Sequence, residues 1–250
     1  MAWVESRSEH FTARHDDRDS GDAVEVLELL EGAREELAPL LEPPPGEIAA
    51  VIHSSSLGLA LSQPVVPVVR AIAAPASRRY LAGWPTSREL HLLPPRILEQ
   101  RASSVPGSLE MLLLAPVALY AQLLCGHHNP ELPPPLRPST ALAAARNAWL
   151  AAGSGQWLSG QTAHARPAIA RRLKEGARPS FPPSASDALL LGGSVFDLLA
   201  VEQGREAAVR LAITAPAPTP RETITRAFPS RSYTDTEGVW RAHLARLAGG

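Results

Sequence analysis

Two apolar segments with a helical pattern constrain the fold of this chain more than any other feature. They span residues 111–124 and 149–160, and neither contains a charged residue. The first is shorter than the roughly 20 residues of a membrane span and is interrupted by Pro116, so it predicts a buried core helix. Because proline inside a helix costs about 3 kcal/mol, we expect this helix to start near Ala115 or to kink there.

The first 110 residues combine strand signals with one amphipathic helix. Apolar residues recur at helical spacing from Asp22 to Leu41, with charged residues between them. Short apolar runs at 48–54 and 89–93 predict strands. Residues 64–72 are rich in β-branched side chains but contain two prolines, which predicts an edge strand or an irregular extended segment.

From Leu109 onward the pattern is helical almost throughout, with proline-rich loops at 132–138, 179–184 and 215–220. Strands followed by helices favour the α+β class over alternating βαβ units. We therefore expect a small mixed β-sheet in the N-terminal half, packed on a mainly helical C-terminal half. The predicted organisation is one domain over residues 1–250, with a strand-containing part at 1–110 and a helical part at 111–250.

Composition argues against several classes of partner. The 24 Lys and Arg residues nearly balance the 25 Asp and Glu residues, for a net charge of −1, and no basic stripe indicates a nucleic-acid partner. No membrane span is expected. Cys125 is the only cysteine, which excludes an internal disulfide. The first residues lack the pattern of a signal peptide, so we expect a cytoplasmic protein.

Few local motifs point to chemistry. Residues 153–155, Gly-Ser-Gly, lie in a helical pattern rather than at the strand-to-helix turn of a nucleophile elbow. The cluster at 125–131 contains thiol, imidazole and carboxylate groups, but its spacing matches no helical ligand pair and favours an ordinary polar loop after a helix. Five of the six other histidines are scattered singly, as is typical of surface or satisfied groups: His10, His53, His91, His164 and His243.

Residues 149–157, Trp-Leu-Ala-Ala-Gly-Ser-Gly-Gln-Trp, resemble a helix of the small peptidase-MA-like zinc metallohydrolases, a gluzincin-type family. That helix typically reads Trp-Leu-x-Glu-Gly-x-Ala-x-Tyr. Other segments are similar to the family in the same order along the chain: Trp3 with residues 9–15, and residues 22–41, 48–54, 188–204 and 237–244. The resemblance implies a zincin-like fold.

The resemblance also implies that the chemistry of the family is lost. A gluzincin holds zinc with two imidazoles four residues apart on one helix face, with a Glu between them as general base and a further Glu as third ligand. The matching positions here are Pro116, Val117 and Tyr120, and Ala152 at the third ligand. The chain has no histidine between His91 and His127, so no shift of register restores the motif.

We therefore expect no cofactor and a vestigial cleft that Trp149, Gly153 and Gln156 help to line. The expected function is that of a catalytically inactive, pseudo-metallopeptidase domain that binds a peptide or protein ligand or acts in regulation. Two alternatives remain open. One is a hydrolase whose metal or catalytic site has moved to His127, His128 and Glu131. The other is a purely structural interaction domain whose cleft is filled by Tyr120 and Leu119.

Overall fold

The computed structural model describes residues 3–249. Its five strands form one small mixed sheet with the order β1-β2-β3-β5-β4, in which β2, β3 and β5 run parallel and the two edge strands run antiparallel to their neighbours. The strands are β1 (Trp3–Arg7), β2 (Phe11–Asp16), β3 (Ile48–Ile52), β4 (Gly83–Pro85) and β5 (Glu89–Leu92). The expected small mixed sheet in the N-terminal part is thus confirmed.

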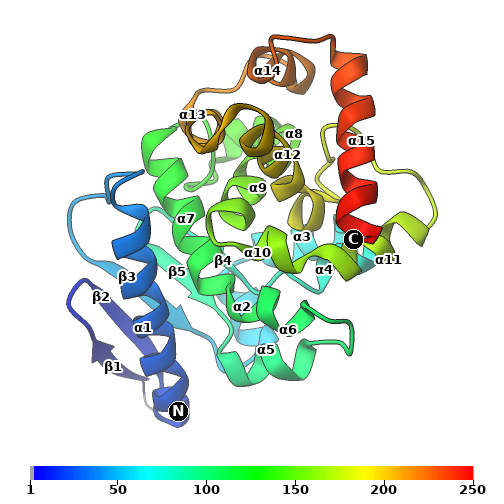
Figure 1. Cartoon of the computed structure of the whole chain (residues 1–250). Coiled ribbons are helices and arrows are strands. Elements are labelled where there is room, and N and C mark those ends of the chain that lie inside the picture. The colour runs from blue at the N-terminus through cyan, green and yellow to red at the C-terminus, as the bar shows by residue number, and fades with distance from the viewer. Residues whose placement is uncertain (1–2, 250) are drawn as a thin grey trace.

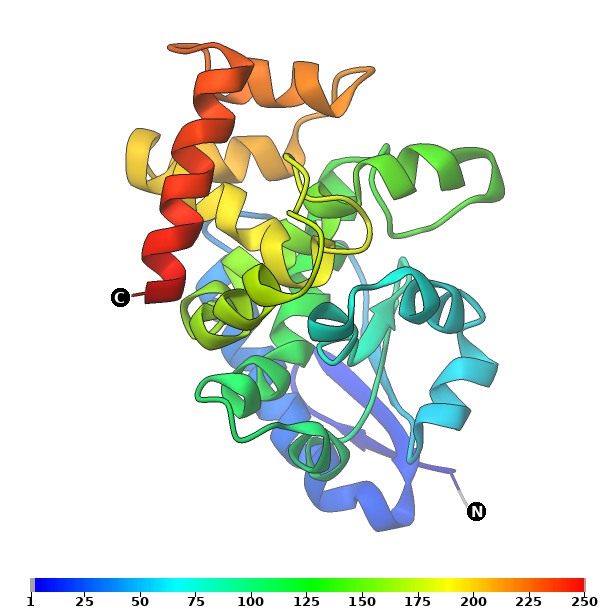
Figure 2. The same cartoon turned by 90° about the vertical axis from the view of Figure 1, so that its right-hand side faces the viewer.

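One face of the sheet is buried under two helices. Leu90 and Leu92 of β5 and Phe11 of β2 belong to the main core, together with side chains of α1 (Ser20–Leu37) and α7 (Ala115–His128). Because side chains alternate along a strand, His91 lies on the opposite face. Figures 1 and 2 show the sheet and α1 at one end of the molecule and the C-terminal helices at the other.

Residues 64–72 differ from the expectation of an edge or extended segment, because they form helix α3 (Val65–Ile72) with Pro64 as its N-cap. The N–H groups of the first helical turn have no partner within the helix, so Pro67 in that turn removes no helical hydrogen bond. α2 (Ser56–Ser62) precedes it, and both helices pack over a smaller second core that includes Leu59 and Val66.

Pro116 behaves as its position predicts. α6 (Ser108–Leu113) ends before it, and α7 begins at Ala115, so the proline lies in the first turn of the new helix. The expectation that a helix starts near Ala115 is confirmed.

Most of the remaining chain is helical. Its helices are α4 (Pro75–Arg78), α5 (Pro95–Arg101), α8 (Ala141–Arg146), α9 (Ala148–Leu158), α10 (Gln161–His164), α11 (Arg166–Lys174), α12 (Ala188–Gln203), α13 (Arg205–Ile213), α14 (Pro220–Ala227) and α15 (Tyr233–Gly249), with short 3-10 turns at Asp17–Asp19 and Pro138–Thr140. Within residues 3–249, no helix is both long and apolar enough to cross a membrane.

Helix α9 lies between α7 and α12. A Cβ atom at Gly155 would lie 2.6 Å from the Ala118 carbonyl oxygen of α7, and one at Gly153 would lie 2.5 Å from the backbone of Gly192 in α12. α7 and α9 are therefore neighbours, and the segment at 141–158 divides at Asn147 into α8 and α9.

Candidate functional site: an apolar groove beside the edge strand

A groove with a volume of about 230 Å³ runs beside edge strand β4. Among the described residues no ionisable side chain lines it, and Gln122 contributes the one side-chain amide. It is lined by Val65, Val68, Val69 and Ile72 of α3; Trp84 and Pro85 of β4; Gln122 of α7; Pro133, Pro134 and Leu136; Ala141, Ala144 and Ala145 of α8; Ala148, Ala151 and Ala152 of α9; and Ala185, Ala188 and Leu189.

The two helical walls of the groove have the same apolar spacing. On α3 the lining residues follow positions i, i+3, i+4 and i+7 from Val65, and residues 141–148 repeat this spacing from Ala141. The four positions on α3 share one face of that helix, whereas Ala141, Ala144 and Ala145 lie on α8 and Ala148 begins α9. Val68 is 60% exposed and Ile72 is 49% exposed, so no element within residues 3–249 covers the apolar face of α3.

Small side chains on α9 leave the groove open. Ala148, Ala151 and Ala152 line it, so the expected third-ligand position belongs to the groove. Large or polar side chains at these positions would fill the space. The three alanines instead form an apolar floor for the groove.

The other side of α9 holds the residues that we expected to line the cleft. Trp149 is fully buried, with its ring 6.4 Å from that of Phe196 in α12. The Gln156 side chain donates from Nε2 to the Ala188 carbonyl oxygen at 2.8 Å and accepts from the Gly193 N–H at 2.9 Å. With Gly153 packed against Gly192, all three residues join α9 to α12. Of the three, Gln156 also borders a small recess of about 40 Å³ under β4.

On α7, the residues that face β4 and α9 differ from the positions implied by the resemblance. Ala118, Leu119 and Gln122 border the recess under β4, and Gln122 also lines the groove with Ala152. None of Pro116, Val117 and Tyr120 is among the lining residues of either space. The i, i+4 pair of α7 that faces these spaces is therefore Ala118 and Gln122, two residues later than the pair implied by the resemblance.

Tyr120 points into the main core and away from the groove. It is fully buried, and its ring meets that of Phe11 edge-on at 5.3 Å between centroids. Burial raises the pKa of its hydroxyl, for which the described residues supply no hydrogen-bond partner. It does not fill the groove.

The free edge of β4 offers few backbone donors. The Thr86 N–H donates to the Glu89 carbonyl and the Leu93 N–H to the Ala82 carbonyl, so by the antiparallel alternation Gly83 and Pro85 direct their backbone groups away from β5. Proline has no N–H, which leaves the Gly83 N–H as the donor of this three-residue edge. A peptide added there as a strand would gain little hydrogen bonding.

The residues near the end of α7 do not converge on a site. Cys125 to His128 form its last turn, which differs from the expected loop, and Cys125 is fully buried so that the pKa of its thiol is raised to about 12. His128 donates from Nε2 to the Glu42 carbonyl at 2.8 Å. Across residues 3–249, no group of three or more His, Cys, Asp or Glu side chains is arranged to hold a metal ion, and this includes His127, His128 and Glu131.

The sheet brings together two histidines that are far apart in the sequence. His53 Nε2 lies 3.0 Å from His91 Nδ1, the rings are stacked at 5.3 Å, and both side chains are buried. A carboxylate accepts hydrogen bonds, so the contact of 3.1 Å between Glu89 and His91 Nε2 places a proton on Nε2. His91 Nδ1 then accepts from His53 and, at 3.3 Å, from the Ser62 hydroxyl.

This pair resists protonation. Burial, followed by the charge of His91, lowers the pKa of His53 to about 4. Burial also lowers the pKa of His91, while the adjacent Glu89 opposes that effect. Both rings are therefore neutral at pH 7, and the network connects the sheet to α2, which leads into the groove wall α3.

Sequence reasoning missed the groove walls. One wall has a helical spacing that the two prolines masked, at Val65, Val68, Val69 and Ile72. The same period recurs in the alanines at 141, 144, 145, 148 and 152. No local pattern marks Trp84 as a groove-lining residue, because its position depends on the pairing of β4 with β5.

Comparison of the chain with protein-family models, with curated proteins and with solved structures finds no match.

Proposed function

We propose that this protein is a catalytically inactive, peptidase-like binding module whose apolar groove holds an apolar segment of a partner protein. The observation that carries the proposal is the composition of the groove. Its volume of about 230 Å³ is lined by aliphatic side chains, Trp84 and prolines, with no nucleophile, acid or base among them. Such a surface gains free energy by removing apolar area from water, at about 25 cal/mol per Å².

The inactive, zincin-like character of the module rests on the arrangement around β4. Two neighbouring helices, α7 and α9, meet beside an antiparallel edge strand, and these are the helices that hold the ligand positions implied by the resemblance. The positions that face this space are Ala118, Gln122 and Ala152, which supply no zinc ligand of the usual kinds. Without such ligands, these residues cannot hold a zinc ion that would activate a water molecule.

An open groove supports a binding role over the alternative of a filled cleft. Tyr120 lies in the main core, and Leu119 packs against Gly83, where a Cβ atom would be 2.6 Å from its Cδ1. Neither side chain occupies the groove. The contiguous apolar lining is typical of a ligand-binding groove.

The walls of the groove favour a helical ligand over an extended one. α3 presents one apolar face with positions i, i+3, i+4 and i+7, and α8 adds Ala141, Ala144 and Ala145; such faces complement the apolar stripe of a third helix. The edge of β4 would give an added strand one N–H donor. We therefore infer that the ligand is the apolar face of an amphipathic helix.

Selection of peptides from a displayed library tests this function. Panning against the full chain should enrich amphipathic helical sequences, and their affinity should be measured by fluorescence polarisation. Val68→Glu places an unpaired charge on the groove wall, so it should weaken binding by at least tenfold.

Val201→Glu is the matched control, because Val201 is 68% exposed on α12 and lies outside the groove. It should leave the affinity unchanged. Equal affinity of the peptides for both variants, or selection of sequences without an apolar face, would contradict the proposal.

A further inference from the structure

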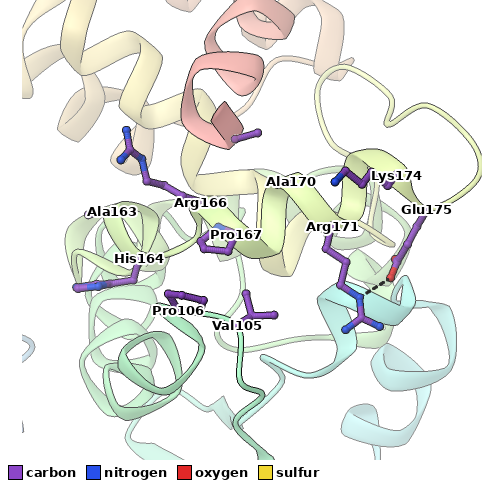
Figure 3. A pocket seen from close by; sticks show the side chains of 12 residues that line it. Val105, Pro106, Ala163, His164, Arg166, Pro167, Ala170, Arg171, Lys174 and Glu175 are labelled. Atoms are coloured by element: carbon purple, nitrogen blue, oxygen red, sulfur yellow. Dashed lines mark hydrogen bonds and ion pairs between the residues drawn. The ribbon is translucent and has the colours of Figure 1, made fainter. Parts of the chain in front are cut away.

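A second hollow lies away from the groove, beside α11. It has a volume of about 930 Å³ and is bordered by residues 105–107, the end of α10, α11 and Ala248 of α15. We call it the α11 basin. Figure 3 shows His164 and Arg166 at one end of it and Arg171, Lys174 and Glu175 at the other.

The wall formed by residues 105–107 is held in place by a close backbone approach. Gly107 has φ +80°, and a Cβ atom there would lie 2.2 Å from the His164 carbonyl oxygen. Glycine is therefore required at this contact. Pro106 and Pro167 further restrict the backbone on either side, so the shape of the basin exists before any ligand binds.

Positive charge predominates in the α11 basin. Its lining includes Arg166, Arg171 and Lys174, against one carboxylate, Glu175. Glu175 is already engaged, since Oε1 lies 3.2 Å from Arg171 Nε and Oε2 accepts from the Ala76 N–H at 3.2 Å. Within residues 3–249, Arg166 and Lys174 form no ion pair, so no carboxylate of these residues competes with a ligand for them.

The floor between these charges is apolar. Figure 3 places Pro167 and Ala170 along α11 between Arg166 and Lys174, and Val105 and Pro106 on the loop below the helix. No Phe, Tyr or Trp side chain is among the lining residues described for the basin. Proteins that bind single-stranded nucleic acid rely on such rings to stack bases, so the basin fits a peptide better than a nucleic acid.

We propose that the α11 basin binds an acidic peptide segment that carries carboxylates at two positions with an apolar residue between them. Arg166 and Lys174 are eight residues apart on α11, which corresponds to about 12 Å along the helix axis. An extended peptide advances about 3.3 Å per residue, so matching carboxylates lie about four residues apart. This site is independent of the groove and of the function proposed for it.

The first test uses the capped peptide Glu-Ala-Leu-Ala-Glu with a fluorescent label and the full protein. Its affinity should fall at least tenfold between low and high salt, because salt screens exposed charges. The peptide with both Glu residues replaced by Gln should not bind. Arg166→Gln and Lys174→Gln should each weaken binding about threefold or more, whereas Arg146→Gln, at an exposed position on α8, should have no effect.

Glu175→Gln provides a test of opposite sign. It frees Arg171 from its carboxylate while an amide oxygen can still accept from the Ala76 N–H, so affinity for the acidic peptide should rise. A merely structural role for Glu175 would not produce this gain. The proposal is overturned if the Gln peptide binds equally, if Arg166→Gln and Lys174→Gln bind as tightly as the unaltered protein, or if tripolyphosphate binds the basin more tightly than the peptide.

Discussion

At the scale of single residues, glycines set the distance between α9 and its neighbours. Gly153 and Gly192 lie opposite each other where α9 crosses α12, and Gly155 faces the Ala118 carbonyl oxygen of α7. Side chains at these positions would push the helices apart. The Gly-Ser-Gly sequence of α9 therefore has a packing role, which accounts for it without a catalytic serine.

Gly153→Ala should destabilise the protein. The added Cβ would lie 2.5 Å from the Gly192 backbone, and overpacking of this kind costs about 1–3 kcal/mol in the free energy of unfolding. Urea unfolding monitored by circular dichroism measures the change. Gly32→Ala is the control, because nothing lies within 4 Å of its added Cβ and the better helix former should stabilise α1 by about 0.5–1 kcal/mol. A neutral Gly153→Ala would show that α9 and α12 are not held this closely.

The pairing of His53 with His91 predicts loss of stability in acid. The pKa of His53 is about 4 in the folded protein and about 6.5 when unfolded, so the unfolded state binds more protons between these values. This stabilising contribution is complete above pH 6.5 and is lost as the pH falls towards 4. Because one pKa unit corresponds to 1.36 kcal/mol, the loss is about 3 kcal/mol.

Urea unfolding at pH 7.5 and at pH 4 should reveal this difference in the free energy of unfolding. His53→Gln should reduce the pH dependence, because it removes the titrating ring. His164→Gln, at an exposed position, should leave the pH dependence unchanged. If the pH profile of His53→Gln matches that of the unaltered protein, the pair does not control acid stability.

The histidine pair also marks a limit of sequence reasoning. His53 follows β3 and His91 lies within β5, so the contact between these two residues, 38 apart in the sequence, depends on the parallel pairing of the two strands. Nothing local to either residue indicates this. By contrast, the position of Pro116 at a helix start was predictable. Proline has no backbone N–H, so an α-helix tolerates it in the first turn but not in the interior.

At the scale of secondary-structure elements, α3 shows how two local rules compete. Pro64 and Pro67 suggested an interrupted strand, whereas the apolar period of residues 65–72 is helical. The prolines fall at the N-cap and first turn, where a helix accepts them, so the period prevails. This element forms one wall of the groove, and misreading it concealed the site.

The orientation of α7 yields a test of its relation to α9. Ala118→His, Gln122→His and Ala152→Glu together should create a zinc site, because Ala118 and Gln122 face the space beside β4 and Gln122 shares the groove with Ala152. Pro116→His, Tyr120→His and Ala152→Glu together should not, since Tyr120 points into the main core. Competition with a chromogenic zinc chelator measures binding.

Circular dichroism of both triple variants separates loss of fold from loss of metal. If the variant at residues 116, 120 and 152 binds zinc and the variant at residues 118, 122 and 152 does not, then Pro116 and Tyr120, rather than Ala118 and Gln122, face Ala152. Failure of both with intact folds would count against a zincin-like arrangement of α7 and α9.

At the scale of the whole molecule, the groove joins the two halves of the chain. α3 and β4 belong to the strand-containing first half, whereas α8 and α9 belong to the helical second half. The division of the sequence into a strand-containing and a helical part was predictable from local patterns. The groove was not, because it exists where those parts meet and its lining depends on which helix faces turn towards each other.

Because the groove spans both halves, a bound ligand should stabilise the molecule as one unit. A selected peptide at 100 times its Kd should raise the free energy of unfolding by about 2.7 kcal/mol, which corresponds to a rise in Tm of roughly 5–10 °C for a chain of this size. Differential scanning calorimetry should show one transition that moves as a whole. Val68→Glu should show no such rise, and Val201→Glu should retain it. Two separate transitions, of which the ligand moves one, would mean that the peptide contacts one half and that the groove does not join them.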